Sequence, residues 1–356
     1  MNGDNTLLAV EDLSVDFSLR GQKYPAVEGV SLQVQAGETV AVVGESGSGK
    51  SVTSLAIMGL IRKPGEVRSG EVHYNGVELL SLSSSERRKY LGRDLSMIFQ
   101  EPTVSLNPAY TIGNQIAEVL KLHQTMGRAE RHQRALDLLR EVGISDLARC
   151  LKSWPHQLSG GMNQRAMIAM AIACNPALLI ADEPTTALDV TVQAQILALL
   201  RQLQKKNRMG MLFITHDLSL LPGIANRAVV MYAGQVVENC SVEELFQRPL
   251  HPYTEALLKS LPAINSGRSQ RLSIIPGAPP RSGERLPGCR FHPRCSYADQ
   301  HCQHTAPELT GDSLSGDRLV RCFHPLIGSV DGRSGDTPAG RHNISTGVKS
   351  EIPGKG

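Results

Sequence analysis

The sequence GESGSGKS occupies residues 44–51. It follows the β-branched run TVAVVG and precedes VTSLAIMGLI, whose composition favours a helix. The stretch fits the pattern G-x-x-x-x-G-K-[ST], in which glycines let the backbone turn so that successive N–H groups face inward. The following helix adds its positive end. Because a strand before and a helix after are the context that the pattern requires, the stretch predicts a nest for a triphosphate rather than a flexible turn.

Each part of this loop has an expected task. Lys50 would reach the β- and γ-phosphates, and Ser51 would bind Mg²⁺. The residues expected to contact the nucleotide are Gly44, Glu45, Ser46, Gly47, Ser48, Gly49, Lys50 and Ser51.

A second motif supplies acidic groups. The run LLIADEP at residues 178–184 is typical of a strand, and Asp182 stands at its carboxyl end, where ligands bind in open α/β sheets. A hard cation such as Mg²⁺ needs an oxygen ligand of this kind. Glu183 follows at once and could polarise an attacking water. A plain strand end with solvated acids is the alternative, and the presence of both motifs disfavours it.

The pattern along the chain predicts its organisation. Strands are expected over residues 7–43, a hairpin around Asn75-Gly76, and a mostly helical block over about 103–175. Strands then alternate with helices, which favours a parallel sheet. After residue 260 the composition shifts to Pro, Gly, Arg and Cys. From about residue 328 it is polar and Gly-rich, and we expect disorder there.

Bulk composition excludes some classes. The net charge is +3 and the Lys and Arg residues are scattered, so nothing points to a nucleic-acid partner. The longest apolar runs are far shorter than the ~20 residues of a membrane span. The first residues contain no basic segment followed by an apolar one, which argues against a secretory signal. We therefore expect a soluble, cytosolic protein.

The sequence LSGGMNQR at residues 158–165 decides the class, because most phosphate-loop proteins lack it. It resembles the signature motif of ATP-binding-cassette (ABC) ATPases, and further motifs of that family follow in order. Residues that resemble the Q-loop, the D-loop, the switch histidine and the aromatic that stacks on adenine are Gln100, Asp189, His216 and Phe17, with Tyr24 as a competing candidate for the last. The resemblance covers about residues 6–260.

The resemblance implies a fold and a mechanism. The fold is an α/β P-loop cassette: a RecA-like core with a β-subdomain, an inserted helical subdomain at about 103–175, and a small Cys-rich extension over 261–327. ATP and Mg²⁺ would bind Lys50, Ser51, Asp182 and Gln100. Glu183 would orient water for in-line attack, and His216 would stabilise the γ-phosphate.

The signature implies a second subunit. The N–H groups of Ser159, Gly160 and Gly161 would open a helix and form another anion site. In the family this site closes over the γ-phosphate held by the opposite subunit, so one chain cannot complete its own site.

Smaller features narrow the family. The segments at residues 101–118, 251–262 and 276–280, and GCRFHPRC at 288–295, resemble those of ATPase subunits of dipeptide and oligopeptide importers, and of relatives that serve nickel or glutathione uptake. This resemblance implies a second ATPase in a heterodimer, two membrane permease subunits and a periplasmic or extracellular solute-binding protein, at the cytoplasmic face of the inner membrane. A soluble non-transport cassette ATPase is the less favoured alternative.

The last cysteines form a separate cluster. Cys289, Cys295, Cys302 and Cys322 are separated by five, six and nineteen residues, which is wider than the usual zinc pairs. Four thiolates suit an iron–sulfur cluster or zinc. Some family members have a [4Fe–4S] cluster at this spacing, so we expect a cluster here, with free thiols and zinc as alternatives.

Overall fold

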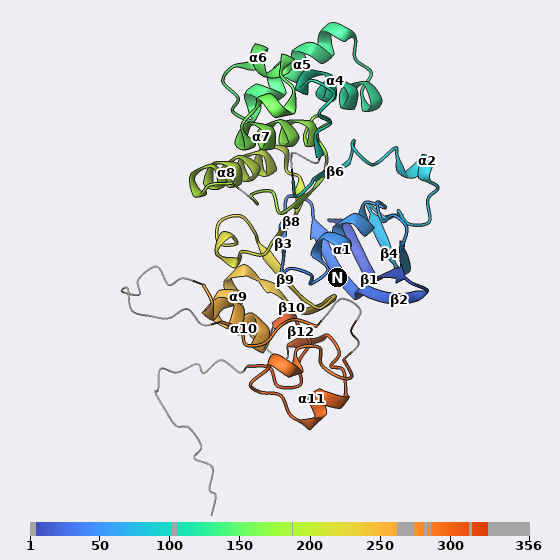
Figure 1. The fold of residues 1–356 in the computed structure, drawn as a ribbon, viewed down its shortest axis with the longest axis vertical. Helices are drawn as coiled ribbons and strands as arrows, with labels where there is room; N and C mark the ends of the chain where they lie inside the picture. The colour runs from blue at the N-terminus through green and yellow to red at the C-terminus, as the bar shows by residue number, and fades with distance from the viewer. Residues whose placement is uncertain are drawn as a thin grey trace, which may run out of the picture.

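The fold was analysed in a computed structural model, which describes residues 5–101, 105–186, 188–261, 274–280, 284, 286–312 and 315–326. Helices gather at one end of the molecule, two sheets form its middle, and the last part of the chain lies at the other end (Figure 1). The predicted disordered tail after residue 327 lies outside the described residues.

Two sheets organise the strands. A four-stranded antiparallel sheet has the order β2-β1-β4-β5, and an eight-stranded sheet has the order β11-β12-β10-β9-β3-β8-β7-β6. The strands are β1 (Thr6–Leu19), β2 (Gln22–Gln35), β3 (Thr39–Val43), β4 (Gly65–Tyr74), β5 (Val77–Glu78), β6 (Leu95–Ile98), β7 (Leu178–Asp182), β8 (Gly210–Thr215), β9 (Arg227–Tyr232), β10 (Gln235–Ser241), β11 (Thr310–Asp312) and β12 (Ser315–Val320).

The helices in the described ranges surround these sheets. They are α1 (Lys50–Ile57), α2 (Ser84–Arg87), α4 (Ile112–His123), α5 (Arg128–Glu141), α6 (Leu147–Lys152), α7 (Gly160–Ala171), α8 (Val190–Asn207), α9 (Val242–Gln247), α10 (Pro252–Lys259) and α11 (Gln300–His304), with the 3₁₀ helices η1 (Pro155–Gln157), η2 (Leu218–Leu220) and η3 (His292–Arg294).

The centre of the large sheet is parallel, as the alternation of strands and helices predicts. β3 pairs in parallel with both β8 and β9, and β7 pairs in parallel with β6 and β8. Both faces of these strands are buried, because successive side chains of a strand point to opposite faces. Leu179 and Phe213 enter one hydrophobic core, whereas Leu178 and Leu212 enter the other.

The predicted hairpin is present in the small sheet. β4 pairs antiparallel with β5 in the register Tyr74↔Val77. Asn75 and Gly76 both have positive φ, of 46° and 77°, which is the conformation that a two-residue type I′ turn requires. The Asn-Gly dipeptide therefore sets the register of this edge.

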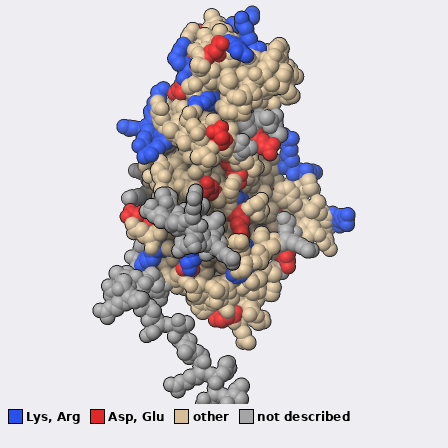
Figure 2. Space-filling model, turned by 60° about the vertical axis from the view of Figure 1, so that its left-hand side comes forward, with Lys and Arg blue, Asp and Glu red and all other residues tan. Residues whose placement is uncertain are grey.

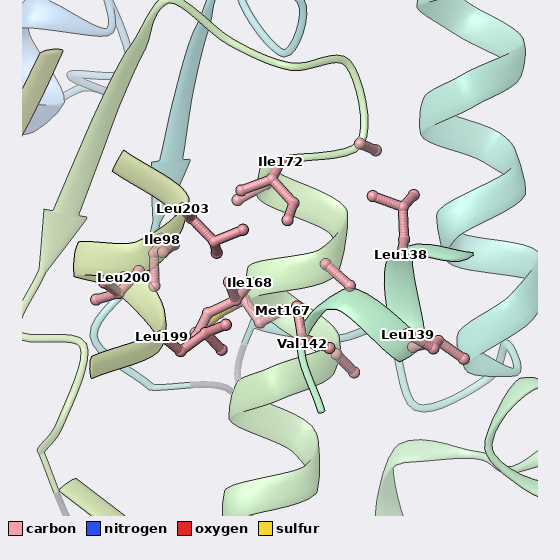
Figure 3. Close-up of a cluster of buried hydrophobic side chains, with 14 of the residues drawn as sticks. Ile98, Leu138, Leu139, Val142, Met167, Ile168, Ile172, Leu199, Leu200 and Leu203 are labelled. Carbon is pink, nitrogen blue, oxygen red and sulfur yellow. The ribbon is translucent and has the colours of Figure 1, made fainter. Parts of the chain in front are cut away.

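The helical end is packed onto the large sheet through one continuous core. Figure 3 shows α7 with Leu138 and Leu139 of α5 and the following residue Val142 on one side, and Leu199, Leu200 and Leu203 of α8 on the other. Met167 and Ile168 of α7, with Ile172 directly after it, fill the space between them. Because α7 contacts both neighbours, the position of its N-terminus depends on the whole helical end.

The last part of the chain continues the large sheet. β12 pairs antiparallel with β10, in the register Glu238↔Val320, and β11 pairs with β12. Residues 310–312 and 315–320 therefore belong to the same sheet as β3, instead of forming a separate sheet.

The surface mixes charges of both signs. On the face drawn in Figure 2, Lys and Arg side chains are interspersed with Asp and Glu side chains and with uncharged ones. Among the residues that the structure describes, no helix combines the length and the apolar character needed to cross a membrane.

Candidate nucleotide-binding site

The predicted site residues follow the carboxyl ends of neighbouring strands. The glycine-rich loop follows β3, His216 follows β8, Asp182 and Glu183 end β7, and Gln100 follows β6. These strands are adjacent in the order β3-β8-β7-β6. Because parallel strands end at the same edge of a sheet, residues that are far apart in sequence meet there.

Close backbone contacts fix the shape of the loop. Gly44 has φ +155°, and a Cβ atom there would lie 2.2 Å from the carbonyl oxygen of Met231. Gly49 has φ +99°, and its Cβ atom would lie 2.9 Å from the Ala26 carbonyl oxygen. Only glycine tolerates such contacts in this conformation. At Gly47, by contrast, the space around the missing Cβ is open within 4 Å, which leaves room for a ligand against the backbone.

The Lys50 side chain extends back along the glycine-rich loop towards the first residues of that loop. Its Nζ atom donates hydrogen bonds to the carbonyl oxygens of Gly44, at 2.8 Å, and Glu45, at 3.0 Å. Burial lowers the pKa of this ammonium, since water no longer solvates the charged form. Neutral carbonyls compensate a buried charge only in part, so an anionic ligand would be a better partner.

The Mg²⁺ ligands expected from the sequence lie together. Ser51 Oγ donates a hydrogen bond of 3.0 Å to Asp182 Oδ1. Burial raises the pKa of Asp182 to about 6. A hydroxyl oxygen beside a buried carboxylate is a donor set that suits a hard divalent cation. These residues therefore fit the ion that the sequence predicts.

The three predicted catalytic side chains converge on one carboxylate oxygen. Glu183 Oε2 accepts a hydrogen bond from Gln100 Nε2 at 3.2 Å and lies 3.2 Å from His216 Nδ1. Thr186 Oγ1 also donates to this oxygen, at 2.9 Å. The sequence analysis missed Thr186, whose position three residues after Glu183 was the available signal.

A cavity of about 640 Å³ joins the loop to these groups. Ser46, Lys50, Ser51, Gln100 and Glu183 all line it. At its other end lie Phe17 and Tyr24, which are directly opposite each other in the β1–β2 register. Both aromatic rings are therefore placed to meet an adenine, and the choice between them stays open.

The signature residues lie away from this cavity. Ser159 is the N-cap of α7 and its Oγ accepts a hydrogen bond from the Met162 N–H. Gly160 has open space around its missing Cβ. Ser159, Gly160, Gly161 and Asp189 are not among the described residues that line the cavity. Asp189 is instead the N-cap of α8.

Comparisons with known proteins agree with this geometry. The family model described as "ABC transporter" matches residues 27–186, and the one described as "Oligopeptide/dipeptide transporter, C-terminal region" matches residues 237–302. The dipeptide transport ATP-binding protein of Escherichia coli is 52% identical over 320 residues, which are 90% of this chain and 97% of that protein. The chain belongs to the ABC transporter family. The family predicted from the motifs is thereby confirmed.

Other ABC proteins match over similar or shorter lengths. The oligopeptide transport ATP-binding protein of Bacillus subtilis is 50% identical over 320 residues, 90% of this chain and 97% of that protein. A solved dimeric ATP-binding cassette in a post-hydrolysis state, bound to ADP and Pi, superposes with a TM-score of 0.60 and 28% identity. It covers 66% of this chain and 98% of that chain.

The predicted iron–sulfur cluster is wrong for this ABC protein. Among the described residues, the candidate ligand atoms that all lie within 4.8 Å of one another belong to Asp299, Cys302 and His324, a group with only one of the four cysteines. Burial raises the pKa of each of the four thiols, that of Cys322 to about 12.

The names of the relatives also give no support to an iron–sulfur cluster. The E. coli and B. subtilis proteins are named for ATP binding and peptide transport, without mention of iron or sulfur. The thiols of Cys289, Cys295, Cys302 and Cys322 line one small space with the rings of Phe291 and Phe323. The zinc alternative stays a prediction, since it rests also on nearby histidines, of which His324 lies with Cys302 and Asp299 in one group of possible ligands.

Sequence reasoning also missed the contacts that residues between 280 and 294 make at the nucleotide cavity and its loop. Arg290, Pro280 and Glu284 line the nucleotide cavity. Arg294 forms an ion pair with Glu45 of the glycine-rich loop. No spacing rule could have found these residues, because 249 positions separate Arg294 from Glu45.

Proposed function

We propose that this chain is the ATP-hydrolysing subunit of an ABC importer for dipeptides and oligopeptides. The observation that carries the proposal is the convergence of Gln100, His216 and Thr186 on the Glu183 carboxylate, next to a complete phosphate-binding loop. Relatives that share half of their residues with this chain over nearly their whole length are named for peptide transport. A nickel or glutathione cargo, the alternative left by the sequence, is disfavoured by those names.

The phosphates of ATP would bind in the loop. Lys50 would exchange its two carbonyl partners for phosphate oxygens, which compensate its charge better. Ser46, Gly47 and Ser48 would present their N–H groups to the same anion. Ser48 Oγ is buried without a hydrogen-bond partner among the described residues, and is thus ready to donate one.

Ser51 and Asp182 would hold Mg²⁺, with Gln100 expected near it. The ion would supply charge compensation for the β- and γ-phosphate oxygens. The hydrogen bond between Ser51 Oγ and Asp182 Oδ1 already holds both oxygen ligands in place.

Glu183 would orient the attacking water. Gln100 and Thr186 fix its carboxylate by hydrogen bonds, so the oxygen that accepts from water has a defined position. His216, on the other side of the same carboxylate, would donate to the γ-phosphate. Positioning and charge compensation provide most of the catalysis in phosphoryl transfer.

We infer a paired assembly. The signature residues of this chain do not line its own cavity in the part of the chain that is described, so their anion site would serve a facing subunit. The solved cassette that matches this chain is dimeric. The proposed partners are a second ATPase subunit in a heterodimer, two membrane permease subunits and a periplasmic or extracellular solute-binding protein. The chain would lie at the cytoplasmic face of the inner membrane.

The proposed division of the chain follows the motifs. Residues 1–260 would form the nucleotide-binding domain, with the helical subdomain at about 103–175. Residues 261–327 would form the small Cys-rich C-terminal extension. The match of the C-terminal family model to residues 237–302 supports a functional unit in this region.

The assembled complex tests the function directly. The chain would be co-expressed with the genes next to its own and purified, and peptide uptake into proteoliposomes measured with ATP inside. We expect uptake that requires ATP and the binding protein, and that Lys50→Ala abolishes. Uptake of nickel or glutathione in place of peptide would show that the proposed cargo is wrong. Co-purification with ribosomes or DNA would overturn the importer function.

A further inference from the structure

Arg294, in the C-terminal part of the chain, forms an ion pair with the phosphate-binding loop. Arg294 Nη1 donates to Glu45 Oε2 at 2.6 Å, and Nη2 donates to Glu45 Oε1 at 3.1 Å. This bidentate geometry is the strong form of an ion pair. The Arg294 side chain is only 4% exposed, so water screens the pair little.

Arg294 is itself held in a fixed position. Its Nε atom donates to the Pro276 carbonyl oxygen at 2.9 Å, and its guanidinium lies 5.8 Å from the centre of the Tyr232 ring. The Tyr232 ring packs against Tyr253 and Phe291, with centroids 4.7 Å and 5.2 Å away. An aromatic cluster thus fixes the arginine, and the arginine fixes Glu45.

Every polar group of Glu45 has a partner. Its N–H donates to Tyr253 Oη at 2.9 Å, and its carbonyl oxygen accepts from Lys50 Nζ at 3.0 Å. Its carboxylate belongs to Arg294. Glu45 directly follows Gly44 and shares the Lys50 ammonium with it, so a change at its carboxylate acts next to the phosphate site.

The charge of Glu45 makes Arg294 necessary. A carboxylate in this loop would repel the phosphates of ATP and would compete with them for Lys50. Arg294 neutralises that charge, and Glu45 is not among the described residues that line the cavity. Without Arg294 the loop would contain one uncompensated negative charge.

We propose that Arg294 is a positioning residue for ATP binding, and that the C-terminal segment at residues 289–295 sets ATP affinity through it. This proposal rests on the proposed function, because ATP is taken as the ligand. It goes further by making the C-terminal segment part of the nucleotide site. Arg290 of the same segment lines the cavity and pairs with Glu28.

Charge variants of the full-length chain test the proposal by ATP titration. Arg294→Gln should raise the ATP Kd about tenfold, because it leaves the Glu45 charge uncompensated near the phosphates. The double variant Glu45→Gln/Arg294→Gln should recover an ATP Kd within about threefold of wild type, because it removes the uncompensated charge together with the arginine. Arg294→Lys keeps the charge but loses the bidentate contact, so its ATP Kd should lie between those of wild type and Arg294→Gln.

This pattern differs from that of a structural ion pair. If the pair only stabilised the fold, the double variant Glu45→Gln/Arg294→Gln would bind ATP at least as weakly as Arg294→Gln, and that result would overturn the proposal. In the assembled complex, Arg294→Gln should raise KM and leave kcat at saturating ATP nearly unchanged. His324→Gln is the matched control, because it breaks an exposed contact, with Asp299, that lies outside residues 289–295.

A second measurement needs no variant. Linkage is reciprocal, so ATP must strengthen the attachment of the C-terminal segment if that segment strengthens ATP binding. Hydrogen exchange at residues 289–295 should slow when ATP is added, more than at α11. Unchanged exchange would refute the proposal even if Arg294→Gln does not fold.

The proposal and the proposed function fail in different ways. If wild type does not bind ATP and Lys50→Ala changes nothing, the proposed function is wrong. If wild type binds ATP and loses it in Lys50→Ala, but Arg294→Gln binds as wild type does, only the role of Arg294 is wrong.

Discussion

At the scale of single residues, Glu183 combines an unusual backbone with a crowded carboxylate. Its φ of 44° is in the left-handed region, where residues other than glycine are uncommon. Its N–H donates to the carbonyl oxygen of Ile214 in the neighbouring strand β8. Strained conformations of this kind cluster at functional sites, since the surrounding structure must hold them. The strand β8 that supports Glu183 also leads to His216.

Removing the charge of Glu183 should separate binding from turnover. Glu183→Gln keeps the shape of the side chain but accepts a proton poorly, so the ATPase rate of the complex should fall by about 10²–10⁴-fold. ATP affinity should be retained. Phosphate release and ATP titration measure the two effects. Glu71→Gln, an exposed acid on β4, is the control. Full turnover in Glu183→Gln would refute the role of this residue.

The pair Arg318–Glu238 offers a stability test. Both side chains are 0% exposed, and their N–O distance is 2.7 Å. Arg318→Met should lower the free energy of unfolding by about 3–5 kcal/mol, because it leaves a buried carboxylate with only its backbone N–H partners. Urea unfolding measures the change. Adding Glu238→Gln should recover part of the loss, and a loss below about 1 kcal/mol would show that the pair matters little.

At the scale of elements, caps show why some helices begin where they do. Asp189 accepts a hydrogen bond from the Val192 N–H at the start of α8, and Ser159 caps α7. Such residues satisfy backbone donors that have no partner within the helix. A residue that the family pattern marks as functional, such as Asp189, thus also has a local structural task.

The cap of α10 should make stability depend on pH. His251 is buried, accepts a hydrogen bond from the Tyr253 N–H, and has its pKa lowered to about 3 by burial. The unfolded chain takes up a proton at this histidine below about pH 6.5, whereas the folded chain stays neutral. The unfolded state then binds more protons, so stability falls as the pH falls from 6.5 towards 3 and is unaffected above 6.5.

The size of this pH-dependent loss of stability can be measured against a variant whose helix cap does not titrate. At pH 5 the cost at His251 should be about 2 kcal/mol relative to pH 8. His251→Asn keeps an N-cap acceptor and removes the titration. The unfolding free energy of wild type minus that of His251→Asn should therefore decrease as the pH falls below 6.5, and it should stay constant above 6.5. A difference that is constant from pH 8 to pH 5 would contradict the assignment.

Sequence predicts the elements whose determinants are local. The glycine-rich loop needs only a strand, a turn and a helix over residues 39–57, and the hairpin needs only Asn75-Gly76. The parallel sheet follows from the alternation of strands and helices. The strand order, the pairing of β12 with β10 and the contact between Arg294 and Glu45 could not be predicted, since they depend on packing between segments that are distant in sequence.

The same distinction explains the error at the cysteines. The cluster was predicted from their spacing, but ligand geometry depends on how the segment packs. The Cys302 backbone N–H donates to the carboxylate of Asp299, the N-cap of α11, and the Cys302 sulfur is grouped with Asp299 and His324 and not with the other three thiols. Spacing alone contains no information about that contact.

At the scale of the whole molecule, the distance between signature and cavity leads to a prediction about assembly. Ser159→Arg should lower the ATPase rate of the complex at least about tenfold, because it blocks the anion site offered to the facing subunit. ATP binding by the isolated chain should change by less than about twofold, since Ser159 does not line its own cavity. Ser85→Arg on α2 is the control. Weaker ATP binding by the isolated Ser159→Arg chain would refute the two-subunit site.

The pairing of β10 with β12 has a consequence for shortened forms of this protein. A premature stop codon before residue 315 would delete β12 and leave the backbone groups of β10 without their neighbour. Unpaired strand edges recruit strands from other chains. Such truncated products would aggregate in the cell instead of persisting as smaller enzymes, so a nonsense mutation at any codon before 315 should be as harmful as a full deletion.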